Sequence, residues 1–131
     1  MFISVNPSSG EPVYRQVMRQ LRERIVSGQL ARGEKLLSVR DLSAEAGINP
    51  LTVAKVYQFL EREGFVETRR GHGTFVAGKA PTLSASARRE ELAPALRQLA
   101  TEALHLGLSE EELLKLVSTT FQNLKPPQDH E

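Results

Sequence analysis

The sequence predicts a mainly α-helical chain with one small β-hairpin, divided into an N-terminal domain and a C-terminal helical arm. Apolar residues recur at helical spacing in several segments, the spacing changes once to the pattern of short strands, and a small polar segment separates the two parts. The chain has 131 residues, of which 40% are hydrophobic and 25% charged. This composition is typical of a globular protein and argues against a disordered or membrane-embedded chain.

A first helix is expected from Pro12 to about Ser27. Proline suits the first position of a helix, because its missing N–H would have no partner there. Gly28 ends the segment, and Gly33 marks a turn before the next element. The apolar residues of this helix recur at four-residue spacing: Val13, Val17, Leu21 and Ile25.

Two short helices are expected next, joined through Gly47-Ile48-Asn49. Ser38 and Asp41 resemble a capping box at the start of the first helix. Asn49 is a good N-cap and Pro50 a good first-turn residue for the second, which Gly64 closes. The positions expected to face the core are Val39, Leu42, Ala46, Val53, Val56, Tyr57 and Leu60. The pair matches the helix-turn-helix pattern.

A β-hairpin is expected directly after these helices. Phe65, Val66 and Thr68 indicate a short strand, residues 69–73 a tight turn, and residues 74–76 a returning strand. The glycines of the turn, Gly71 and Gly73, allow a positive φ. A hairpin in this place makes a helix-turn-helix domain winged, so residues 1–78 are expected to form a winged helix-turn-helix domain.

The remainder is expected to be a linker at residues 79–87, a two-helix arm at residues 88–125 and a frayed tail at residues 126–131. One helix of the arm should run from about Arg88 to Leu106, with Pro94 delaying or kinking its start. The other should follow a capping box of Ser109 and Glu112 and end near Leu124.

The apolar stripes of the arm are too large for two helices alone in water. Their members are Leu92, Leu96, Leu99, Ala103, Leu113, Leu116, Val117 and Phe121. Burial of one such large side chain contributes roughly 1.5–3 kcal/mol, which favours packing against a second copy as a homodimer. The alternative is that the arm folds back on its own winged domain.

Charge is distributed unevenly along the chain. Residues 1–79 carry 12 Lys/Arg and 8 Asp/Glu, a net charge of +4, and residues 80–131 carry 5 and 8, a net charge of −3. A basic N-terminal part is consistent with a polyanionic partner, although two ordinary solvated surfaces would explain it as well.

Several classes of site and location are not expected. The absence of cysteine excludes disulfides and thiolate zinc sites, and His72, His105 and His130 lack the spacing of metal ligands. Neither a nucleophile with a base, nor paired carboxylates, nor a phosphate loop occurs at useful spacing, so we expect neither an enzyme nor a cofactor. No apolar run approaches the roughly 20 residues of a membrane span, and without a secretion signal a cytoplasmic location is expected.

The run from Pro12 to Val76 resembles the GntR family of bacterial regulators. The residues that carry this resemblance keep fixed spacings: Gly28, Leu30, Gly33, Leu36, Ser38, Arg40, Leu42, Thr52, Val53, Tyr57, Leu60, Glu61, Gly64, Gly71 and Gly73-Thr74-Phe75-Val76. The phrase INPLTV, followed by a short two-helix arm, is similar to the YtrA branch. Two positions depart from the pattern: Leu37, where the family usually has proline, and Pro50, where many relatives have an arginine. The first departure should loosen the turn before the second helix slightly without touching the proposed DNA surface.

The resemblance implies binding to double-stranded operator DNA, with the third helix in the major groove and the hairpin at the phosphates or minor groove. The candidate DNA-binding residues are Ser38, Arg40, Asn49, Leu51, Thr52, Lys55, Arg69, Arg70, Gly71 and His72. Thr52 would contact a phosphate or a thymine methyl, or cap the helix instead. Asn49 would substitute for the missing arginine as a base contact, although capping alone explains it. Lys55 is a candidate phosphate partner, with a solvated lysine as the alternative. Tyr14 and Tyr57 are interpreted as core aromatics rather than base-stacking residues.

The resemblance also implies a repressor, commonly of a neighbouring transporter operon, that binds a palindromic operator as a homodimer. A winged-helix module that binds proteins and not DNA is the alternative, but it predicts a neutral surface on the third helix. About 44 residues after the linker leave no space for a large ligand domain. A small-molecule effector, if there is one, would therefore sit between arm and winged domain or at the dimer seam.

Overall fold

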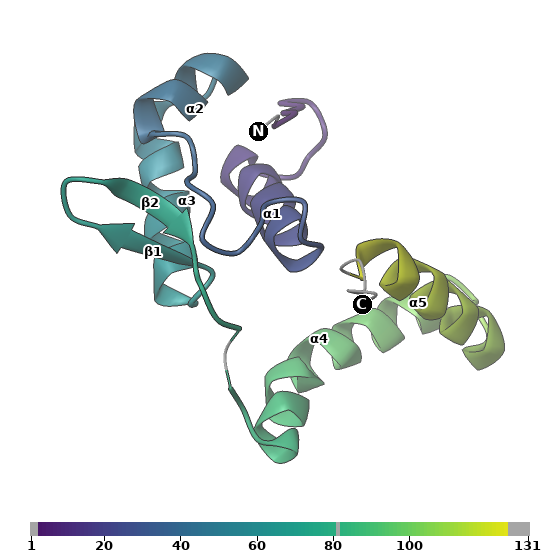
Figure 1. Cartoon of the computed structure of the whole chain (residues 1–131). Coiled ribbons are helices and arrows are strands. Elements are labelled where there is room, and N and C mark those ends of the chain that lie inside the picture. The colour runs from purple at the N-terminus through teal and green to yellow at the C-terminus, as the bar shows by residue number, and fades with distance from the viewer. Residues whose placement is uncertain (1–2, 81, 126–131) are drawn as a thin grey trace. The chain divides into compact units, whose positions relative to one another are not determined.

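The computed structural model describes residues 3–80 and 82–125 and divides them into two compact units (Figure 1). The first unit, here called the winged unit, lies within residues 3–80. It contains α1 (Val13–Val26), α2 (Val39–Ala46), α3 (Pro50–Arg62), β1 (Val66–Arg69) and β2 (Gly73–Val76). The second unit, the arm, contains α4 (Ala85–His105) and α5 (Glu110–Leu124). The predicted fold class is confirmed, and the tail expected at residues 126–131 lies outside the described residues.

The ends of the three helices of the winged unit follow the predicted capping residues closely. Ser38 and Asn49 are the N-caps of α2 and α3, and Gly47 ends α2 with a φ of 69°. In the turn between them, the Ser43 hydroxyl donates a hydrogen bond to the Ile48 carbonyl. One detail differs, because Pro12 is the N-cap of α1, with ψ at 145°, and not its first helical residue.

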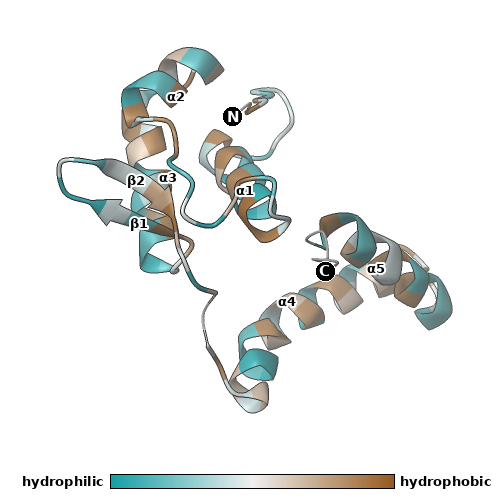
Figure 2. Cartoon of the chain, in the orientation of Figure 1, coloured by the Kyte–Doolittle hydropathy of each residue, from teal (hydrophilic) through white to brown (hydrophobic). Residues whose placement is uncertain are grey.

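The core of the winged unit is built from the predicted apolar stripes (Figure 2). Its fully buried large side chains come from all three helices and β2: Leu21, Leu42, Leu60, Val17, Val53, Val56 and Val76. Tyr57 is buried among them, as expected, but the interpretation of Tyr14 as a core aromatic is wrong, because it is 44% exposed. Val13, Gln16 and Val17 take the inner face of α1, which leaves Tyr14 on the outer face.

The hairpin pairs β1 and β2 in antiparallel register, with Val66 opposite Val76 and Arg69 opposite Gly73. A third extended segment, residues 34–36, joins the free edge of β2. Lys35 forms a bridge with Phe75, and the Leu36 amide donates to the Thr74 carbonyl at 2.8 Å. The sequence analysis did not predict this pairing, which attaches the chain before α2 to the hairpin.

A buried glutamine holds the N-terminal segment on α1. Gln16 is only 3% exposed, and its amide nitrogen donates to the carbonyls of Asn6 and Glu11 and to the Ser9 hydroxyl. Its amide oxygen accepts from the Asn6 backbone N–H at 2.8 Å. Ile3, at the start of this segment, belongs to the core.

In the arm, α4 begins at Ala85, three residues before the expected Arg88. The Ser84 hydroxyl accepts from the Ala87 amide and caps the helix, so the predicted linker at 79–87 ends early. The small residues at 85–87 were interpreted as part of the linker, but two of the three are alanines, which favour helix strongly. Pro94 lies inside α4 without ending it, and the capping box of Ser109 and Glu112 is confirmed at α5. None of the described helices is long and apolar enough to cross a membrane.

Candidate nucleic-acid interface

The start of α2 carries the first group of candidate residues. The Ser38 hydroxyl accepts a hydrogen bond from the Asp41 amide at 3.0 Å, so its oxygen is engaged in capping while its own proton stays available. Arg40 is the second residue of the helix and is exposed. Because Leu42 on the same helix is fully buried in the core, the backbone that carries Arg40 is fixed against the unit.

The start of α3 carries the second group. Asn49 caps the helix through its side-chain oxygen, which accepts from the Leu51 amide at 2.8 Å. Leu51 is 71% exposed and Lys55 is exposed, whereas Thr52 is half-buried. The capping interpretation of Thr52 is wrong, because Asn49 is the cap.

This helix end offers fewer free amides than its sequence suggests. Pro50 has no N–H, Leu51 donates to the Asn49 side chain, and the Thr52 amide donates to the Asn49 carbonyl at 3.0 Å. A phosphate at this position would therefore be attracted by the helix dipole and by side chains rather than by open backbone donors.

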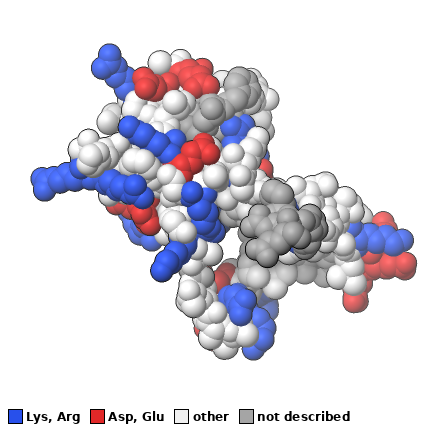
Figure 3. All heavy atoms as spheres, viewed as in Figure 1, with Lys and Arg blue, Asp and Glu red and all other residues white. Residues whose placement is uncertain are grey.

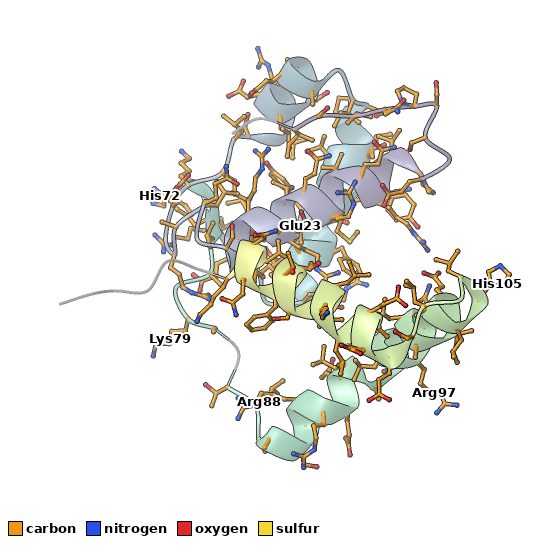
Figure 4. All side chains as sticks on the ribbon, turned by 90° about the vertical axis from the view of Figure 1, so that its right-hand side faces the viewer. Glu23, His72, Lys79, Arg88, Arg97 and His105 are labelled. Carbon is orange, nitrogen blue, oxygen red and sulfur yellow. The ribbon has the colours of Figure 1, made fainter. Side chains whose placement is uncertain are left out.

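The hairpin turn carries the third group. The His72 amide donates to the Arg69 carbonyl at 2.9 Å, and Gly71 at the third position of the turn has a φ of 78°, as a type II turn requires. The Arg69 guanidinium lies over the Phe75 ring, 4.3 Å from its centre, and 4.0 Å from the Glu67 carboxylate. Arg70 and His72 project from the tip without such partners among the described residues, and Figure 4 shows His72 at the outer edge of the unit.

The candidate residues are accessible, and their cations are largely uncompensated. Of the predicted DNA-binding residues only Thr52 is half-buried, and the rest are exposed. Within residues 3–80, Arg40, Lys55 and Arg70 form no ion pair. Since α2 packs on α3 and α3 packs on β1, one small domain carries the three groups. Figure 3 shows Lys and Arg side chains over α2 and the hairpin.

The sequence analysis missed two side chains next to these groups. Lys35 lies on the segment that joins β2, and its stem crosses Gly73, so a Cβ there would be 2.9 Å from the Lys35 Cε. Tyr57 was interpreted as a core residue only, yet its hydroxyl donates to the Leu37 carbonyl at 2.7 Å. Burial raises the pKa of Tyr57 above its ordinary value, so the hydroxyl stays a donor at working pH. No sequence signal marked either contact, because both join segments distant in the chain.

Gly73→Ala is expected to destabilise the hairpin by about 1–3 kcal/mol, because its φ of 117° lies in a region that L-residues rarely adopt. The contact with Lys35 adds little, since that side chain is flexible. Urea unfolding of the variant measures the loss. Gly78→Ala is the matched control, because Gly78 has ordinary φ and open space around it. Equal stability of both variants would contradict this account of the turn.

The arm presents an apolar groove between its two helices. The groove has a volume of about 400 Å³ and is lined from both helices, among others by Leu99, Ala103, Leu113, Leu116 and Phe121. Most predicted dimerisation residues are exposed in the single chain: Leu92, Leu96, Leu99, Leu116, Val117 and Phe121. Ala103 is buried and Leu113 half-buried, although both line this groove. Figure 4 shows Arg97 and His105 projecting from α4.

Known proteins resemble this chain over nearly its whole length. Residues 13–76 match the family described as "Bacterial regulatory proteins, gntR family". The HTH-type transcriptional repressor YtrA of Bacillus subtilis is 35% identical over 123 residues, which cover 94% of this chain and 95% of the repressor.

Solved structures agree with the sequence matches. A crystal structure named as a transcriptional antiterminator from Listeria monocytogenes has a TM-score of 0.83 and 35% identity, and the match covers 100% of this chain and 97% of that one. The DNA-binding domain of AraR, solved in complex with operator ORX1, has a TM-score of 0.51 and 28% identity over 59% of this chain and 93% of its own. The family and these relatives are transcription regulators, not enzymes. The chain therefore belongs to the GntR family of bacterial regulatory proteins, in its YtrA branch.

Proposed function

We propose that this regulator represses transcription by binding a palindromic operator as a homodimer. In each protomer α3 would enter a major groove, with Arg40 and the start of α3 at the base edges and the hairpin at the adjacent phosphates or minor groove. The operator would lie upstream of its own operon, and by family resemblance we expect a transporter among the neighbouring genes.

The observation that carries this proposal is that one face of α3 is buried in the core while its first turn is exposed to solvent next to cations that are unpaired within residues 3–80. Val53, Val56 and Leu60 anchor the helix in the core, whereas its first residues and the cations around them remain in solvent. The likeness to AraR, whose DNA-binding domain was solved on an operator, supports the same use of the fold. A protein-interaction module would not need uncompensated cations at this place.

The arm supports the dimeric half of the proposal. Its helices are each capped and well formed, yet large apolar side chains of both remain exposed, and several of these line the groove between the helices. A second copy of the arm offers a surface of the same apolar character and would remove these side chains from water. Two-fold symmetry would then place the α3 helices roughly 10 bp apart, or a multiple of this, along the DNA.

Titration of the purified protein with DNA from its own upstream region tests the proposal. We expect a protected palindromic site and a steep salt dependence. If Lys55, Arg69 and Arg70 of both protomers contact phosphates, six contacts in all, the slope of log K against log salt should be about −5. Absence of both a footprint and any salt-sensitive affinity would overturn the proposal and favour a protein partner.

Leu51 is expected to contact a thymine methyl group, because an apolar side chain this exposed on α3 has no partner in its own domain. Replacement of operator thymines by deoxyuridine, one position at a time, should identify one position per half-site that weakens binding about 4-fold, from ~0.8 kcal/mol per methyl. Leu51→Ala should remove this difference, whereas Leu104→Ala on the arm should keep it. A wild-type protein indifferent to every substitution would refute the contact.

A further inference from the structure

The hydroxyl of Tyr57 reaches from α3 to the segment that precedes α2. The other buried apolar side chains of α3, Val53, Val56 and Leu60, make only packing contacts with the core. Tyr57 adds a directed one, since its hydroxyl donates to the Leu37 carbonyl at 2.7 Å. A buried hydroxyl needs such a partner, so the bond fixes the position of that carbonyl.

The segment held by this bond leads directly into α2. Leu36 is fixed to the hairpin by its amide, which donates to the Thr74 carbonyl, and Leu37 is fixed to α3 by its carbonyl. Ser38, the next residue, is the N-cap of α2, and Arg40 follows two residues later. One short stretch of backbone thus connects the hairpin, α3 and the start of α2, which carry the three groups of candidate DNA-binding residues.

The backbone at Leu37 is not restrained by the covalent structure of the residue itself. A leucine leaves φ free to rotate, unlike the proline that is usual in the family at this position. Among the described residues its amide donates no hydrogen bond. The Tyr57 hydroxyl therefore provides a restraint that the backbone of this chain lacks.

We infer that Tyr57 is a positioning residue for DNA recognition, whose hydroxyl fixes the start of α2 on α3 and thereby sets where Arg40 meets the operator. This inference rests on the proposed DNA-binding function. Packing of the core requires only the aromatic ring, which phenylalanine also supplies. The hydroxyl is thus the part of the side chain that acts on recognition, and it acts through Arg40 and not through contact with DNA.

A double-mutant cycle tests the inference. Tyr57→Phe should weaken operator binding about 5-fold, the value of one hydrogen bond, and leave affinity for unrelated DNA unchanged. In the Arg40→Ala background the same substitution should have no further effect. In the Arg70→Ala background, which alters the hairpin tip, it should keep its full effect. Equal losses in both backgrounds, or no loss in the wild type, would overturn the inference.

Rescue by proline provides a second, independent measurement. Leu37→Pro should restore the restraint, so that Tyr57→Phe loses less than 2-fold of operator affinity in that background. A loss that stays at about 5-fold there would show that the hydroxyl does not act by holding this backbone.

Measurements without DNA separate this inference from the proposed function. Tyr57→Phe should accelerate amide hydrogen exchange at Asp41 and Leu42, which bond to Ser38 in the first turn of α2, while the circular dichroism spectrum stays unchanged. Unchanged exchange would contradict the restraint whatever the protein binds. A wild-type protein that shows the restraint but no salt-sensitive DNA affinity would contradict the proposed function instead.

Discussion

Phe121→Asp is expected to convert the proposed homodimer to a monomer and to weaken operator binding by about 10²–10⁴-fold. Phe121 lines the groove of the arm and is 63% exposed in the single chain, so in a dimer it would be among the side chains removed from water. A carboxylate at that place would have to be buried without a partner, which opposes association. With the dimer lost, the two half-sites are bound independently, and the gain from linking them disappears.

Two measurements and a control make this prediction specific. Analytical ultracentrifugation should give 14.5 kDa for the variant and twice that mass for the wild type. Fluorescence anisotropy should show unchanged affinity for a single half-site, because the winged unit is not altered. Leu104→Asp is the matched control, since Leu104 is 78% exposed on α4 but does not line the groove. A dimeric Phe121→Asp protein, or a monomeric Leu104→Asp protein, would place the interface elsewhere.

The arm shows which part of an interface a sequence can predict. The stripes of α4 and α5 indicated surplus apolar surface, because their spacing follows the helical period and needs no knowledge of neighbours. The same period does not separate side chains that join the two helices from those left for a partner. Among the predicted dimerisation residues Ala103 is buried and Leu113 half-buried already in the single chain, which the spacing alone did not indicate.

The winged unit was predictable wherever the signal is local. Ser38, Asn49 and Gly47 mark helix ends by their own side chains or by the lack of one, and the structure uses each of them so. At the start of α3 the same Asn49 takes two amide donors, those of Leu51 and Thr52, which a bound anion would otherwise use. Capping and anion binding compete for the same donors, and the sequence alone does not show which one takes them.

Contacts between distant segments could not be predicted. The pairing of Lys35 with β2 and the bond from Tyr57 to Leu37 each join residues about 20 or more positions apart. No periodicity connects such positions, and tyrosine in an apolar stripe is explained by its ring alone. The N-terminal segment is the largest such omission, because its polar composition resembles that of a loop.

Gln16→Met is expected to destabilise the winged unit by about 3 kcal/mol, although it lies outside every candidate site. Methionine keeps the length and helix propensity of the side chain but removes the amide, whose oxygen accepts one hydrogen bond and whose two N–H groups serve three acceptors. At about 1 kcal/mol net for the oxygen and for each N–H, the loss is about 3 kcal/mol. Faster amide exchange at Asn6 should accompany the lower free energy of unfolding in urea. Gln58→Met, on the exposed face of α3, should leave stability within 0.5 kcal/mol of the wild type. If Gln16→Met were equally harmless, the segment before α1 would be held by Ile3 in the core and by the hydrogen bonds between Ser4 and Gln20 rather than by this amide.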